Sequence, residues 1–300
     1  MNQQLSKRAA LALFATVIFA WGFNWTVVKL TLQHMTPLWM IAIRSGLAAV
    51  VLLFVMLATG NLRVPKRGDM PVVCSIALLH MTAFAALMAI GIQFVPAGRS
   101  IVLGYTTPLW VTPAAVLFLG ERLTPARVAG VALGMAGLVV MFNPLAFDWA
   151  DHRALLGNGL LLLSAFSWAI SILHTRAHQW ISTPFQLVFW EVLLATVVLA
   201  LLALMFEGRP QIEWSGQLVL LLAYGSVIGV ALGYWAIAMV NRSLPAVTTS
   251  LGVLATPVVG VLCSMLVLDE PFSLALLVAL GMIIGGIALG TLGGKPAGKS

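Results

Sequence analysis

Residues 10–32 read ALALFATVIFAWGFNWTVVKLTL, an apolar run with a single charged residue, Lys29. A helix needs about 20 apolar residues to cross the roughly 30 Å hydrocarbon core of a bilayer. The run is too long for the apolar region of a signal peptide, and no small-residue cleavage site ends it, so we expect it to be retained. This stretch predicts a membrane-spanning helix.

Nine more apolar runs follow, separated by breaks rich in proline, glycine and charge. They cannot be strands, because backbone groups in lipid need partners and the runs do not alternate. We therefore predict an all-α membrane protein with ten transmembrane helices. The predicted spans are Ala10–Leu32, Pro37–Leu57, Val72–Phe94, Ala97–Leu119, Pro125–Phe142, Leu155–Ala177, Pro184–Phe206, Gln217–Met239, Pro245–Leu268 and Ser273–Leu292.

The composition excludes other classes of protein. The chain is 61% hydrophobic and only 8% charged, whereas soluble domains carry roughly 25% charged residues. The net charge is +7, but the basic residues stand singly between apolar runs, which argues against nucleic-acid binding. Cys74 and Cys263 lie far apart inside apolar runs and show no disulfide or metal-ligand spacing. We expect no metal or cofactor.

Basic residues are distributed unevenly between the two predicted faces, which sets the orientation. One face collects Lys7, Arg8, Arg63, Lys66, Arg67, Arg122, Arg127, Arg176, Arg242, Lys295 and Lys299; the other collects Arg99, Arg153 and Arg209. The asymmetry predicts a multi-pass protein of the inner (cytoplasmic) cell membrane with both termini in the cytoplasm.

The chain repeats itself at an offset of 147 to 149 residues, which predicts two halves, 1–143 and 144–300. Five spans per half is an odd number, so the second half must enter the membrane from the opposite face, as in many secondary transporters. The matching positions include Phe19-Ala20-Trp21 with Phe166-Ser167-Trp168, Thr36-Pro37 with Thr183-Pro184, Thr107-Pro108 with Thr256-Pro257, and Glu121 with Glu270.

Two motifs carry a resemblance to a known family. The first span contains Trp21-Gly22-Phe23-Asn24-Trp25-Thr26-Val27-Val28-Lys29, and the fourth and ninth spans end in Leu119-Gly120-Glu121-Arg122-Leu123 and Leu268-Asp269-Glu270-Pro271. These motifs resemble those of the EamA family of the drug/metabolite transporter superfamily, and within it most closely the YddG-type amino-acid exporters. The resemblance covers nearly the whole chain and implies a ten-helix basket, a central cavity, and export of aromatic and other neutral amino acids.

Aromatic and polar residues near mid-span are candidates for contact with substrate. Trp21 and Trp168 match by repeat and lie too deep for the aromatic belts at the membrane surfaces. Aromatic cavity walls suit apolar or aromatic side chains, although core packing explains these residues equally well. The candidates are Trp21, Asn24, His80, Tyr105, Trp168, Tyr224 and Tyr234.

Charged residues inside a span are costly, at roughly 2.5–3.5 kcal/mol on insertion scales. Lys29, Arg44 and Glu191 are therefore candidates for gating or ion pairing. Lys29 can also snorkel to the interface. Arg44 and Glu191 match by repeat, but inversion separates them by roughly 10 Å along the membrane normal, so we expect each near its own interface rather than paired.

Prolines and glycines mark helix breaks and close packing. Pro108 and Pro257 interrupt the fourth and ninth spans and are candidate hinges, or simple kinks. Gly130-x-x-x-Gly134 and Gly281-x-x-x-Gly285 predict close helix packing. We expect this packing within a monomer, with a dimer as the alternative.

These features favour a secondary transporter of a small metabolite, working by alternating access. Transporters of phosphorylated or nucleotide sugars, or of drugs, are the alternative, although phosphate groups need several buried cations. A passive channel is a further alternative that predicts a ring of polar residues. An enzyme is not expected, because no cluster of His, Asp or Glu has catalytic spacing.

Overall fold

The computed structural model describes residues 5–120, 124–142, 150–233, 236, 239–240, 243–244, 252–271 and 273–292. Within these ranges the protein is helical throughout, and its extended structure is limited to an isolated bridge between Met35 and Ile212. The predicted all-α architecture is confirmed at this level.

Among the described residues, six helical segments are long and apolar enough to cross a membrane. They are α1 (Lys7–Thr31), α2 (Pro37–Ala58), the third span with η1 (Arg67–Asp69), α3 (Met70–Ser75), η2 (Ile76–Phe84) and α4 (Ala85–Gly91), the fourth span with α5 (Ala97–Gly104) and α6 (Thr107–Leu119), α8 (His152–Ala177) and α9 (Pro184–Phe206). Shorter apolar helices fall on the remaining predicted spans: α7 (Pro125–Phe142), α10 (Gly216–Ala223) continuing into η3 (Tyr224–Leu232), α13 (Ala255–Leu268) and α14 (Leu274–Leu292). A total of ten spans stays a prediction.

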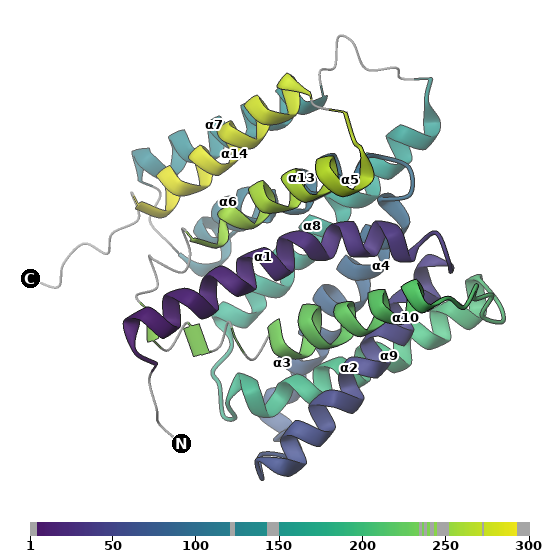
Figure 1. Cartoon of the computed structure of the whole chain (residues 1–300). Helices are drawn as coiled ribbons and strands as arrows, with labels where there is room; N and C mark the ends of the chain where they lie inside the picture. The colour runs from purple at the N-terminus through teal and green to yellow at the C-terminus, as the bar shows by residue number, and fades with distance from the viewer. Residues whose placement is uncertain are drawn as a thin grey trace, which may run out of the picture.

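The helices run up and down a single bundle, as Figure 1 shows. The start of α1 and the end of α14 lie on the same side of it. We call this side, with Lys7, Ala58, Ala177 and Pro184, the terminal face. The other side, with Thr31, Pro37 and Phe206, is the distal face.

Contacts between helices fit a two-repeat fold. Helix α2 packs on α9, and α7 packs on α14 as a pair at one edge of the bundle (Figure 1). Helix α1 packs on α13, and α8 correspondingly packs on α5 and α6. Exchange of the two halves about a twofold axis produces this pattern, because it maps each of these contacts onto another contact of the same kind.

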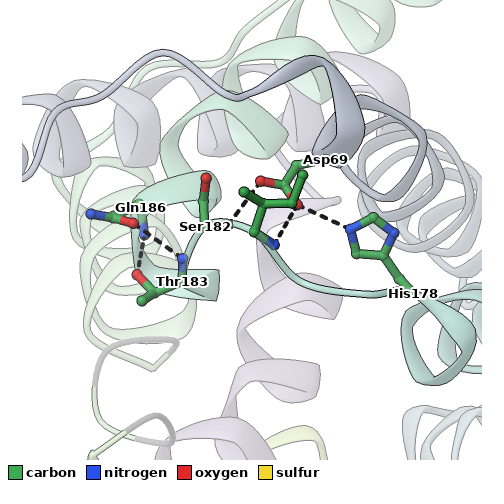
Figure 2. A network of polar contacts seen from close by, with 6 residues as sticks. Asp69, His178, Ser182, Thr183 and Gln186 are labelled. Carbon is green, nitrogen blue, oxygen red and sulfur yellow. Dashed lines mark hydrogen bonds and ion pairs between the residues drawn. The ribbon is translucent and has the colours of Figure 1, made fainter.

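Asp69 joins the two halves at the terminal face (Figure 2). Its fully buried carboxylate accepts hydrogen bonds from the backbone nitrogens of Ile181 (3.1 Å) and Ser182 (2.9 Å) and lies 3.0 Å from Nε2 of His178. The next residue, Thr183, begins α9 with a capping box that includes Gln186. A carboxylate thus holds the loop that leads into a helix whose first N–H groups lack partners within the helix.

Two glutamates make the same kind of contact at the distal face. Glu207, after α9, accepts hydrogen bonds from the backbone nitrogens of Leu38 (2.8 Å) and Trp39 (3.0 Å) at the start of α2. Glu270, after α13, accepts from the first two N–H groups of α5, at Ala97 and Gly98. Each carboxylate comes from the second half and accepts hydrogen bonds from the start of a helix in the first half. Charged hydrogen bonds therefore join the halves in addition to apolar packing.

Close packing of α7 and α14 uses the glycines predicted on α7 but a different glycine from those predicted on α14. A Cβ on Gly286 would collide with the backbone of Gly130, and the reverse also holds, so the two helices meet backbone to backbone there. Gly281, in contrast, faces open space. The prediction was right for α7 and wrong for α14, because sequence spacing marks a small-residue stripe without fixing which stripe faces the partner.

Irregular turns interrupt the helices near mid-membrane in both halves. The segments η2 and η3 are each nine residues of π-helix, at nearly equivalent positions of the third and eighth spans. The fourth span is broken at Tyr105 and Thr106, between α5 and α6. Such wide turns are rare and are frequent at functional sites.

The apolar core is divided unequally between the faces. One continuous cluster fills the distal half and includes Trp25, Ile92, Leu199 and Leu222. Three smaller, separate clusters occupy the terminal half, around Leu52, Phe14 and Val72. Among the described residues, apolar burial is therefore more extensive at the distal face.

Candidate functional site

A central cavity of about 170 Å³ lies where the irregular turns meet. Its walls come from α1, α2, η2, α4, α8, α9 and η3, and so from both halves. In a π-helix the hydrogen bonds skip one residue further than in an α-helix, which widens the turn and changes the direction of the side chains that follow. Residues of both π-helical segments line the cavity: His80, Met81 and Phe84 from η2, and Gly229 and Val230 from η3.

One wall is a stack of three aromatic rings. His80 of η2 lies flat on Trp168 of α8, with ring centroids 4.9 Å apart and planes within 6°. Phe84, one turn after His80, tilts against both rings at 5.7 and 5.1 Å. Phe84 and His80 hold the indole in place, so its exposed surface can receive an apolar ligand group.

The facing wall comes from α1 and the break in the fourth span. Trp21 donates its indole N–H to the carbonyl oxygen of Gly229 in η3 (3.2 Å). Trp25 lies against Tyr105, with ring centroids 6.4 Å apart. A Cβ at Gly104 would collide with the Trp25 ring, so glycine is required there for α5 to approach α1.

The polar edge of the cavity is formed by Arg44 and Asn24. Arg44 Nη1 lies 3.4 Å from Oδ1 of Asn24. A Cβ at Gly225 would lie 2.7 Å from Cδ of Arg44, so the side chain extends over the π-helical segment η3. We expected Arg44 near the membrane interface. The structure places it at the cavity wall, because its long side chain lies along the glycine surface of η3 and so reaches the cavity.

The structure places five of the seven predicted substrate contacts around this cavity: Trp21, Asn24, His80, Tyr105 and Trp168. Their contact with a substrate stays a prediction. Tyr224 is directed elsewhere, since its hydroxyl donates to the carbonyl oxygen of Ala20 (3.0 Å) and its ring packs on Phe23. Tyr234 lies outside the described residues.

Apart from Arg44, the predicted gate and hinge residues Lys29, Pro108 and Pro257 lie away from the cavity. Lys29 Nζ donates to the carbonyl oxygens of Ile92 and Val95, at 2.7 Å each, where the third span ends at the distal face. Pro108 follows the break between α5 and α6, and Pro257 is buried in the first turn of α13. Their roles in gating or bending stay predictions.

Glu191 is buried between helices and does not line the cavity. Its neighbour Val192 does line it. The Glu191 side chain is only 5% exposed, and Oε1 has no hydrogen-bond partner among the described residues.

Sequence analysis missed several residues of the cavity wall, Phe84 and Met88 among them. These two follow His80 at intervals of four residues, so all three lie on one side of the helix. That spacing was the available signal. Ser45 and Gly229 carried no comparable signal, because small residues are common throughout the chain.

Apolar helices that surround a central cavity with aromatic side chains in its walls are typical of membrane transporters of small molecules. The model of the EamA-like transporter family matches residues 8–143 and again residues 155–292. The chain belongs to this family, whose members are transporters. It is therefore a multi-pass membrane protein.

Relatives agree with this assignment. The chain is 27% identical over 287 residues to the uncharacterized transporter YvbV of Bacillus subtilis, covering 96% of this chain and 93% of YvbV. It is 28% identical to a probable amino-acid metabolite efflux pump of Salmonella typhimurium, covering 96% and 95% of the two chains. A solved crystal structure superposes with a TM-score of 0.66 at 24% identity, covering 97% of this chain and 99% of that one, which supports the fold.

Proposed function

We propose that the protein exports aromatic and other neutral amino acids through its central cavity by alternating access. The observation that carries the proposal is a cavity with aromatic walls and one cationic edge at Arg44. A guanidinium pairs well with a carboxylate, and the rings of Trp168 and Trp21 suit an apolar side chain. The relative from Salmonella typhimurium, named as a probable amino-acid metabolite efflux pump, supports the same substrate class.

The size of the cavity argues against larger substrates. About 170 Å³ is below the roughly 300–1,000 Å³ typical of pockets for drug-sized ligands. A nucleotide sugar would also need several cations to meet its phosphates. Both features disfavour phosphorylated metabolites, and a substrate screen that includes them tests this alternative.

The unequal core supports a direction of access. We infer that the cavity opens toward the terminal face, where the core is split, and is sealed by the continuous distal cluster. With both termini in the cytoplasm of an inner-membrane protein, this is the state that loads substrate from the cell. Rocking of the two halves would then expose the cavity at the distal face.

Counterflow in proteoliposomes tests the proposal. Vesicles loaded with unlabelled phenylalanine should transiently accumulate labelled phenylalanine against its gradient, because a carrier exchanges substrates one for one. A passive channel only equilibrates the label. No accumulation with any neutral amino acid, from protein that is correctly folded and inserted, would refute amino-acid export.

A further inference from the structure

Glu191 is an acid in a place that disfavours its charge. It lies seven residues into α9, so at 1.5 Å per residue it lies about 10 Å below the terminal end of the helix. The side chain is 95% buried, and Oε1 accepts no hydrogen bond from the described residues. An ionised carboxylate buried without a partner costs several kcal/mol, so such a group takes up a proton instead.

The charged and titratable groups on the neighbouring helices are directed elsewhere. Helix α9 packs on α2, α3 and η2. Arg44 of α2 extends over η3 toward Asn24, and the His80 ring of η2 lies flat on Trp168. Asp69, just ahead of α3, is engaged with the loop before α9, and α3 itself carries the thiol of Cys74. None of these interactions supplies Glu191 with a cation.

The repeat indicates what Glu191 faces. It lies 147 residues after Arg44, on the equivalent helix. Arg44 extends from α2 over η3, and the matching contact in the other half is α9 on η2. By this equivalence Glu191 faces η2, the segment that supplies His80, Met81 and Phe84 to the cavity. Val192, the residue that follows the acid, lines the cavity, so Glu191 lies close to its wall.

We propose that Glu191 is a reversible proton-binding site that couples proton movement to substrate export. The carboxylate takes a proton from hydronium on one side of the membrane, so one O–H bond of hydronium breaks as the carboxyl O–H bond forms. On the other side the carboxyl O–H bond breaks and the proton returns to water. In the conformation that buries Glu191, its carboxyl group holds the proton. In the conformation that exposes Glu191 to water, the carboxyl group releases the proton. Because the two forms prefer different arrangements, protonation and access are linked.

Coupling rests on the proposed export function, whereas proton binding does not, so two experiments are needed. The first is infrared difference spectroscopy of the purified full-length protein, recorded across a pH titration without substrate. Wild-type protein should show the C=O stretch of a protonated carboxyl group that Glu191→Gln lacks. Glu213→Gln is the control, since Glu213 is exposed beyond α9 and its variant should retain the band.

The second experiment measures labelled phenylalanine in proteoliposomes. A pH difference of one unit across the vesicle membrane corresponds to about a tenfold substrate gradient for one-to-one coupling. With this difference imposed, wild type and Glu213→Gln should approach tenfold accumulation of labelled phenylalanine. Glu191→Gln should show none, yet keep counterflow at equal pH within about threefold of wild type.

The outcomes separate the two proposals. An infrared band that persists in Glu191→Gln overturns proton binding at this residue. Counterflow without pH-driven accumulation in wild type, or accumulation that survives in Glu191→Gln, overturns coupling. A complete lack of counterflow in wild type refutes amino-acid export, and the infrared result still decides whether Glu191 binds a proton.

Discussion

The two halves of the protein share a shape but place opposite charges at one position of the repeat. Arg44 on α2 reaches the cavity and lies 3.4 Å from Asn24. Glu191 on α9 is buried, and its Oε1 has no partner in the described ranges. The equivalent of Asn24 in the second half is Ser171, a shorter side chain that is also buried.

The difference teaches that duplication of the fold constrains shape and leaves chemistry free. Both positions accept a long side chain between helices. The first half has a cation there, Arg44, and the second half has an acid, Glu191. We therefore expect function to depend on Arg44 and Glu191. The following predictions test it, from the largest expected effect to the smallest.

Replacing Arg44 by Leu should cause the largest loss. A hydrogen bond to a charged group contributes about 1.5–3 kcal/mol, so substrate affinity should fall roughly 10- to 100-fold. Substrate dependence of counterflow measures the change, and Arg44→Lys should recover part of it by keeping the charge. Equal affinity in wild type and Arg44→Leu would mean that the substrate carboxylate binds elsewhere.

Replacing Gly286 by Ala should separate α7 from α14. The new Cβ collides with the backbone of Gly130, and overpacking of this kind costs about 1–3 kcal/mol. The melting temperature in detergent should fall. Gly281→Ala is the matched control on the same helix, because open space surrounds Gly281 and alanine favours helix by about 1 kcal/mol. A fall of equal size in both variants would contradict the observed packing.

Replacing Trp21 or Trp168 should weaken export by different routes. Aromatic contacts contribute about 0.5–1.5 kcal/mol beyond area burial, so either alanine variant should lose roughly tenfold in transport. Phenylalanine should restore transport at Trp168, whose ring stacks on His80, but less well at Trp21, whose indole N–H donates to the carbonyl oxygen of Gly229. Normal export by both alanine variants, at normal expression, would remove these residues from the site.

Replacing Glu191 by Gln should have the smallest effect on stability. The two side chains have nearly the same shape, and Oε1 gives up no hydrogen bond with a described residue. The melting temperature at pH 7 should therefore not fall. A loss above about 1 kcal/mol, the typical effect of a destabilising substitution, would reveal a structural partner for this carboxyl group.

The sequence anticipated much of the site because repeat and depth are both visible in one dimension. Trp21 and Trp168 match by offset and lie at mid-span, and the structure brings both to the cavity. The same reasoning predicted that Arg44 lies at the interface, and this was wrong. Depth along a helix does not determine the direction in which a long side chain extends. Phe84 and Met88 were detectable from their spacing after His80.

The carboxylate contacts were harder to foresee. Glu270 belongs to a recognised motif, but its acceptance of hydrogen bonds from Ala97 and Gly98 depends on loops that approach only in the folded bundle. Asp69 and Glu207 had no distinguishing pattern at all. Loop carboxylates are common, and only tertiary structure decides which ones meet a helix N-terminus.

By itself the sequence determined a helical membrane protein built from a repeated unit, because burying backbone in lipid demands long apolar helices. Tertiary structure decided where the π-helical turns η2 and η3 fall, and hence where the cavity lies. It also decided that Arg44 reaches that cavity while Glu191 is buried and does not line it. The physical reason is that apolar composition specifies the solvent, whereas side-chain direction depends on local turn geometry and on neighbouring helices.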